Sequence, residues 1–178
     1  MMKKLYDRTG YAITDLVITI TCVIVITVSV FQIYKITKEK IAITDTITTI
    51  KRANDNIRTY FAYDGNYSGI KKMKGTDFYY RGFLSKRWSC DNSRKCKSNN
   101  GVTVKLSNES ETNGKLLFGW TFSNLSPSFC AELLTSGIKG LTSVTINGAS
   151  SEATGNTLTN FVINNCNKKN NSVKMVFF

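Results

Sequence analysis

The stretch RTGYAITDLVITITCVIVITVSVFQIY, residues 8–34, decides how this chain is organised. From Leu16 to Tyr34 it contains no charged side chain, and about 20 such residues are enough to cross a bilayer as a helix. The basic sequence MMKKLYDR precedes it, and a bias of this kind keeps the N-terminus in the cytoplasm and sends the rest of the chain outward. We therefore expect a membrane-spanning helix with the remainder of the chain on its outer side.

Asp15 is an unusual residue for such a helix, because a carboxylate deep in a membrane costs roughly 2.5–3.5 kcal/mol on insertion scales. If the chain is cut between Gly10 and Tyr11, Tyr11 gains a free α-amino group and Asp15 becomes the fifth residue of the mature chain. In staggered neighbouring helices, the Asp15 carboxylate of one copy can then neutralise the Tyr11 amine of the next. Removing either charge would leave the other buried and unpaired, at about 3–5 kcal/mol. We therefore predict that Asp15 and Tyr11 direct subunit assembly.

These residues resemble the start of a type IV prepilin. KKLYDRTG corresponds to a short basic leader that ends in glycine, and YAITDLVITITCVIVITVSV to a bulky first residue and an acidic fifth residue within an apolar helix. The resemblance implies a prepilin peptidase that cuts after Gly10 and methylates Tyr11. It also implies an assembly ATPase with an inner-membrane platform, and a self-assembled helical filament with bundled helices at its core. Two departures are Asp15, where the family usually has Glu, and the absence of Gly and Pro within the run.

The overall composition argues against catalysis. Lys and Arg outnumber Asp and Glu by 24 to 12, which gives a formal charge of +12, and histidine is absent. Histidine is the commonest general base and a frequent metal ligand, so we expect no enzyme, no metal site and no cofactor. The positive charge favours anionic partners such as DNA, lipid headgroups or anionic cell-surface glycans.

Beyond the apolar run, isoleucines continue at helical spacing and predict one helix over 11–62. A leader peptide over 1–10 precedes it, and a globular head over 63–178 follows, beginning at the turn residues YDGNYSG. The narrow apolar face of this helix needs the head to cover it. That face comprises Ile36, Ile43, Ile47, Ile50, Ile57 and Phe61.

The head is expected to be an α+β domain on one antiparallel sheet. A short helix is predicted at FCAELLTSGI after Pro127, and alternation places Val173, Met175 and Phe177 on one face of the last strand. The predicted strands are 101–107, 115–122, 143–148, 160–165 and 172–178.

Four of the five cysteines lie outside the apolar run and favour an oxidising compartment, the alternative being buried reduced thiols. Cys22 lies in the apolar run and is expected to behave as a small apolar residue. The other four form two natural pairs, Cys90 with Cys96 and Cys130 with Cys166, and two disulfides are expected. Sequence alone permits three pairings of four cysteines.

The second half of the chain narrows the resemblance. SPSFCAELL, then VTING, then a cysteine and an alternating last strand are similar to the disulfide-bounded region of type IVb pilins. IRTYFAYDGNYSGI resembles the junction of helix and head in the thin-pilus, PilS-type branch of that family.

The segment 71–105 is a candidate patch for an anionic ligand, because basic and aromatic residues together can bind single-stranded nucleic acid. The alternative is an ordinary solvated surface whose aromatic residues lie in the head core. The aromatic residues are Phe78, Tyr79, Tyr80, Phe83 and Trp88. The basic residues of the patch are Lys71, Lys72, Lys74, Arg81, Lys86, Arg87, Arg94, Lys95 and Lys97.

The sequence thus predicts a structural subunit, most simply the major pilin of a type IVb pilus of a Gram-negative bacterium. It would be an inner-membrane precursor and then part of an extracellular filament used for adhesion, mating-pair contact or biofilm. One alternative is a minor pilin or a type II secretion pseudopilin. Another is an uncleaved, signal-anchored periplasmic binding protein.

Overall fold

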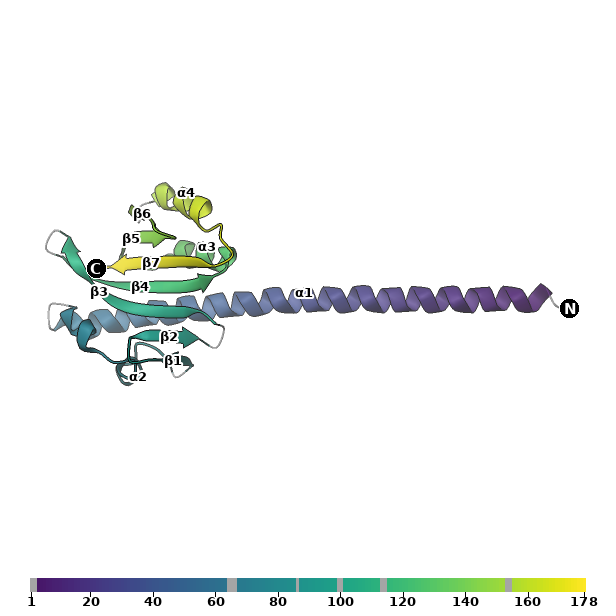
Figure 1. Cartoon of the computed structure of the whole chain (residues 1–178), viewed down its shortest axis with the longest axis horizontal. Coiled ribbons are helices and arrows are strands. Elements are labelled where there is room, and N and C mark those ends of the chain that lie inside the picture. Colours follow the sequence, from purple (N-terminus) through teal and green to yellow (C-terminus); the bar gives the residue numbers. More distant parts are fainter. Residues whose placement is uncertain (1–2, 64–66, 86, 99–100, 113–114, 153–154) are drawn as a thin grey trace. The chain divides into compact units, whose positions relative to one another are not determined.

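The computed structural model describes two compact units, Met1–Ala42 and Ile43–Phe178, and helix α1 (Lys3–Ala62) contributes to both (Figure 1). The residues described are 3–63, 67–85, 87–98, 101–112, 115–152 and 155–178. Side chains are described for the same residues except 3–12, 79, 110–112, 115–116 and 155–156.

Helix α1 begins at Lys3, earlier than the start predicted at Tyr11, and it ends at Ala62, where the turn residues begin. The chain has a single proline, Pro127, so nothing in α1 removes a backbone donor. Gly10 lies inside the helix, where a glycine costs about 1 kcal/mol relative to alanine without ending it. The segment predicted as a leader is therefore continuous in backbone conformation with the helix that follows.

The part of α1 in the second unit buries the predicted face. Ile43, Ile50, Ile57 and Phe61 are all buried in the core of the head, and Ile47 is half-buried against it. The buried face therefore follows the predicted spacing from Ile43 onward, whereas the prediction was wrong for Ile36, which is 57% exposed.

The head contains a seven-stranded sheet in the order β1-β2-β3-β4-β7-β5-β6, and every neighbouring pair is antiparallel. This confirms the expected α+β fold, a long N-terminal helix on an antiparallel sheet. The last strand lies inside the sheet between β4 and β5, so distant segments meet there (Figure 1). The strands are β1 (Trp88–Cys90), β2 (Lys95–Ser98), β3 (Thr103–Thr112), β4 (Lys115–Leu125), β5 (Leu141–Ile146), β6 (Ala149–Glu152) and β7 (Asn171–Phe177).

Strands β4 and β7 form the centre of the core. Val173, Met175 and Phe177 are buried on one face of β7, as alternation predicts. They lie opposite Phe122, Trp120 and Phe118 of β4, which are also buried. The rings of Phe118 and Phe177 stack with centroids 5.5 Å apart, and aromatic pairs of this kind stabilise a core beyond the area they bury.

Helix α3 (Pro127–Thr135) connects β4 to β5 and confirms the predicted short helix. The Ser126 side chain caps its N-terminus by accepting a hydrogen bond from the backbone N–H of Phe129 at 3.2 Å. Pro127 stands at the start of the helix, where its missing N–H is not needed.

The strand predicted over 160–165 is wrong, because these residues belong to helix α4 (Gly155–Asn165). Leu158, Phe161 and Val162 are spaced by three and four residues, and this spacing places them on one helical face against the core. The sheet instead gains β6, which forms a hairpin with β5 through Asn147 and Gly148. Both residues have positive φ (53° and 96°), as a tight two-residue hairpin requires.

The middle of the chain contains short elements for which no strand or helix was predicted. The 3₁₀ helix η1 (Ser68–Lys72) and helix α2 (Asp77–Tyr80) precede β1 and β2. Phe78, Phe83 and Trp88 anchor this segment in the core.

Candidate functional site

The N-terminal part of α1 presents an apolar surface. In Ile13–Ala62 the structure has a helix that is long and apolar enough to cross a membrane, with a mean hydropathy of 2.6 in its most apolar window. None of that window is buried within the chain. Each large apolar side chain from Ile13 to Ile36 for which an exposure is known is 50–63% exposed: Ile13, Leu16, Val17, Ile18, Ile20, Val23, Ile24, Val25, Ile26, Val28, Val30, Phe31, Ile33, Tyr34 and Ile36.

Asp15 lies within this apolar surface and is exposed. Its backbone carbonyl accepts a hydrogen bond from Thr19 Oγ1 at 2.8 Å. Gly10 and Tyr11 belong to the same helix, but their side chains lie outside the described ones. The cleavage after Gly10, the methylation of Tyr11 and the pairing of Tyr11 with Asp15 therefore stay predictions.

Four hydroxyl groups in the apolar half of α1 are satisfied by the helix itself. Thr19, Thr21, Thr27 and Ser29 each donate to the carbonyl four residues earlier, at 2.7–2.8 Å. Because these donors are already used, the apolar surface carries fewer unpaired polar groups than its sequence suggests.

Two disulfides link elements of the head. Cys90 and Cys96 lie opposite each other on β1 and β2 and are bonded. Cys130 of α3 is bonded to Cys166, which follows α4. Cys22 is a free, exposed cysteine in the apolar half of α1. Among the described residues, no group of three or more His, Cys, Asp or Glu side chains is placed to hold a metal ion.

Two of the basic residues predicted as an anionic-ligand patch contact residues of α1. Arg81 lies over the ring of Tyr60, 4.3 Å from its centroid. Arg87 Nη1 lies 3.8 Å from Asp45 Oδ1 in a well-exposed pair, and such pairs are worth about 0–1 kcal/mol. Both arginines are thus directed partly toward α1.

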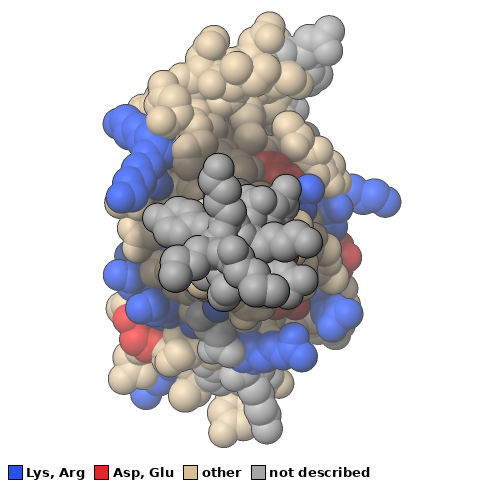
Figure 2. All heavy atoms as spheres, turned by 90° about the vertical axis from the view of Figure 1, so that its right-hand side faces the viewer, with Lys and Arg blue, Asp and Glu red and all other residues tan. Residues whose placement is uncertain are grey.

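The remaining basic residues lie on separate elements. Arg94 donates to the carbonyl of Ile70 at 3.3 Å. Lys95 and Lys97 are exposed on β2 beside an open depression of about 450 Å³. In Figure 2, Lys and Arg side chains lie on several sides of the surface in view instead of forming one field. Lys86 lies outside the described residues, and the exposed lysines around η1 are Lys71, Lys72 and Lys74.

The aromatic residues of this segment support the core interpretation. Phe78, Phe83 and Trp88 are buried, so a stacking role is wrong for these three. Tyr80 is exposed, and the side chain of Tyr79 is outside the described ones. Any binding of nucleic acid here would depend mainly on phosphate contacts.

No protein-family model matches the sequence, and no curated protein matches it. Among solved structures, the chain is similar to the crystal structure of a type IVb pilin from Salmonella typhi, with a TM-score of 0.53 and 17% sequence identity. The match covers 72% of this chain and 95% of that chain.

The chain has the type IVb pilin fold.

The described part of the head contains a polar pocket on α1 that the sequence does not predict. Lys51, Asn54 and Lys139 line a common pocket, although Asn54 and Lys139 are far apart in the chain. No motif or repeat pattern connects these positions. Asn54 is a polar residue within the apolar face of the predicted helix, and this is the signal in the sequence that could have indicated the pocket.

Proposed function

We propose that this chain is a pilin, a structural subunit that polymerises through the apolar half of α1 into an extracellular filament of the type IVb class. The observation that carries the proposal is the combination of a pilin fold with an uncovered apolar helix. More than a dozen large apolar side chains of that helix are at least half exposed, and such a surface needs either lipid or other copies of the chain.

The apolar half of α1 suits lipid before assembly and other copies of the same helix after it. Before assembly, the apolar half of α1 would anchor the precursor in the inner membrane, with the head on the outer side. After cleavage by a prepilin peptidase, the same half would pack against identical helices, driven by an assembly ATPase and its membrane platform. Asp15 would pair with the Tyr11 amine of a neighbouring copy and fix the stagger between them.

The mass of the mature chain tests this proposal. Filaments sheared from cells that express the chain should contain a subunit that begins with N-methylated Tyr11. A subunit that still begins at Met1 and stays in the membrane fraction would contradict the proposal and favour an uncleaved, anchored binding protein. A processed subunit that is scarce in the sheared fraction would instead indicate a minor pilin or a secretion pseudopilin.

A further inference from the structure

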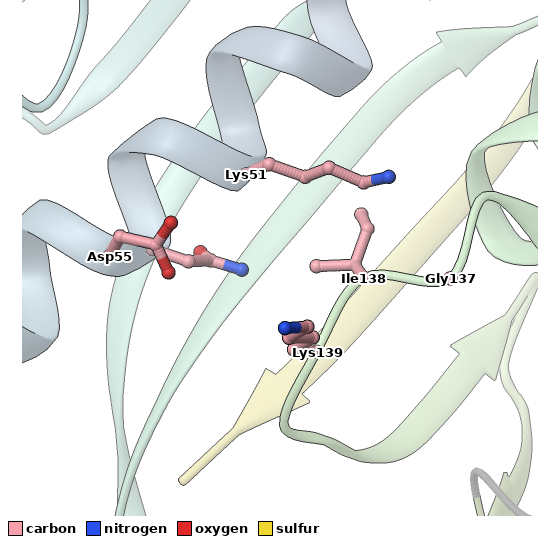
Figure 3. A pocket seen from close by; sticks show the side chains of 6 residues that line it. Lys51, Asp55, Gly137, Ile138 and Lys139 are labelled. Atoms are coloured by element: carbon pink, nitrogen blue, oxygen red, sulfur yellow. The ribbon is translucent and has the colours of Figure 1, made fainter.

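A small polar pocket lies in the second unit between α1 and the loop that follows α3 (Figure 3). Its volume is about 240 Å³. Lys51 reaches from the helix toward the loop, and Lys139 extends from the loop itself (Figure 3). The pocket is lined by Lys51, Asn54, Asp55, Gly137, Ile138 and Lys139.

Asn54 brings an unused hydrogen-bond donor to this pocket. Its Oδ1 accepts a hydrogen bond from Trp120 Nε1 at 2.7 Å, and an indole nitrogen can only donate, so the orientation of the amide is fixed. Asn54 is 1% exposed, and its Nδ2 is buried without a hydrogen-bond partner among the described residues. Buried donors are nearly always paired, so this nitrogen points to an acceptor that comes from outside the chain.

The charges of the pocket favour a single carboxylate as that acceptor. Two ammonium groups, of Lys51 and Lys139, and one carboxylate, of Asp55, line the pocket and give it a net charge of +1. Lys51 donates to the carbonyl of Ser136 at 2.8 Å, and an ammonium group has two further N–H bonds to offer. The volume is below the range of about 300–1,000 Å³ that is usual for small-molecule sites, so the tip of a side chain fits better than a free ligand.

Outside the pocket, two exposed carboxylates among the described side chains of the head form no hydrogen bond or ion pair within the chain. They belong to Glu132 of α3 and Glu152 of β6. An open-ended assembly joins two different surfaces of the subunit. Glu132 lies on α3, next to the loop of the pocket, whereas Glu152 lies on β6, an edge strand of the sheet. Glu152 therefore lies on a surface different from that of the pocket, as an open-ended assembly requires, whereas Glu132 does not.

We propose that this pocket receives the Glu152 carboxylate of a second copy of the chain, which accepts hydrogen bonds from Asn54 Nδ2 and from the ammonium groups of Lys51 and Lys139. The inference rests on the proposed function, because it requires heads packed side by side. Charge-assisted hydrogen bonds of this kind are strong and directional, so they would fix the register between neighbouring heads.

The first experiment tests the chemistry of the pocket in the full chain held in detergent micelles. Glutarate is titrated against the Asn54 side-chain amide resonance, with chloride adjusted to constant ionic strength. We expect saturable binding with a dissociation constant of about 10 mM. Lys139→Gln should weaken binding at least fivefold, whereas Lys169→Gln, an exposed lysine outside the pocket, should not. The absence of a saturable shift would overturn the assignment of a carboxylate.

The second experiment tests the source of the carboxylate. Filaments are assembled from a mixture of ¹⁵N-labelled and ¹³C-labelled subunits, and solid-state NMR records transfer between subunits. We expect transfer between Asn54 Nδ2 and a glutamate δ-carboxyl carbon that Glu152→Gln abolishes and Glu132→Gln preserves. The opposite pattern, or no transfer in intact filaments, would overturn the assignment of Glu152. Failure of the processed subunit to form filaments in cells that supply the peptidase, the ATPase and the platform would refute the proposed function, and the glutarate result would still test the pocket.

Discussion

Asn54 and Trp120 link the helix to the centre of the sheet through a buried hydrogen bond of 2.7 Å. Asn54→Ala removes the acceptor and leaves the indole N–H buried and unpaired, so we expect a loss of about 1–3 kcal/mol in the free energy of unfolding. In a Trp120→Phe background the same change should be less destabilising, because no donor is left unpaired. Denaturant unfolding of the four proteins measures this coupling, and equal effects in the two backgrounds would contradict it.

Asp91 organises the loop closed by Cys90 and Cys96. Its Oδ1 accepts hydrogen bonds from Ser93 Oγ at 2.7 Å and from the backbone N–H groups of Ser93 and Lys95 at 2.9 and 3.0 Å. The Ser93 hydroxyl and then the Lys95 N–H are the main causes that hold the pKa of Asp91 below its ordinary value.

The sign of the pH effect follows from this shift. In the unfolded chain Asp91 titrates at its ordinary pKa, so its carboxylate contributes fully to stability above that pH. The contribution is lost as the pH falls through the lower pKa of the folded state. A ¹³C titration of the Asp91 carboxyl should give a midpoint below the ordinary value, and Ser93→Ala should move the midpoint upward. An unchanged midpoint in Ser93→Ala would be inconsistent with this cause.

At the scale of elements, helix α1 offers a matched pair of isoleucines. Ile50 is 0% exposed, whereas Ile41, on the same helix, is 65% exposed. In the chain held in detergent, Ile50→Ala should destabilise the head by about 2–5 kcal/mol, because it leaves a cavity in the core. Ile41→Ala should change stability by less than about 0.5 kcal/mol. Thermal unfolding followed by circular dichroism compares the two, and similar losses would show that the buried face is misassigned.

The two disulfides should contribute different amounts to the free energy of unfolding. Cys130 and Cys166 are separated by 36 positions in the sequence, and Cys90 and Cys96 by only 6. On the chain-entropy argument the longer loop contributes about 4 kcal/mol and the shorter one about 2 kcal/mol. Replacing each pair by alanine and measuring unfolding in denaturant should therefore show the larger loss for Cys130 and Cys166. The reverse order would mean that strain or structure in the unfolded chain dominates.

The elements that the sequence predicts are those with a strong apolar period. The α1 face from Ile43 to Phe61 and the alternation in β7 both bury large side chains, so their patterns are visible without a structure. Helix α4 was mistaken for a strand, because the short run NFVINN contains β-branched residues that suit either conformation. Strand β2 buries only Cys96 and Ser98 and is held by pairing and a disulfide, so it has no apolar signal.

Of the two candidate sites, the one at Asp15 can be predicted from the sequence and the pocket at Asn54 cannot. Asp15 stands out in the sequence because a charge is rare in an apolar run. The pocket with Asn54 could not be foreseen, because it depends on how the loop at Lys139 folds against the helix. A tertiary contact of this kind leaves no local pattern in the sequence.

For the whole molecule, assembly should depend on the charge at Asp15. Asp15→Ala should lower the yield of sheared filaments roughly tenfold or more, since an unpaired buried amine at Tyr11 would cost about 3–5 kcal/mol. Asp15→Glu keeps the charge and should retain most of the yield. Quantifying the subunit in the sheared and membrane fractions checks both variants, and an undiminished yield for Asp15→Ala would exclude this pairing as the basis of assembly.

The hydroxyls of Thr19, Thr21, Thr27 and Ser29, each bonded back to its own helix, bear on how a subunit could leave the bilayer. None of these four hydroxyl groups needs a new hydrogen-bond partner when the helix leaves the lipid and packs against neighbouring copies of α1. Ser and Thr at these positions would therefore add no hydrogen-bonding cost to the transfer of α1 from lipid to a bundle of identical helices.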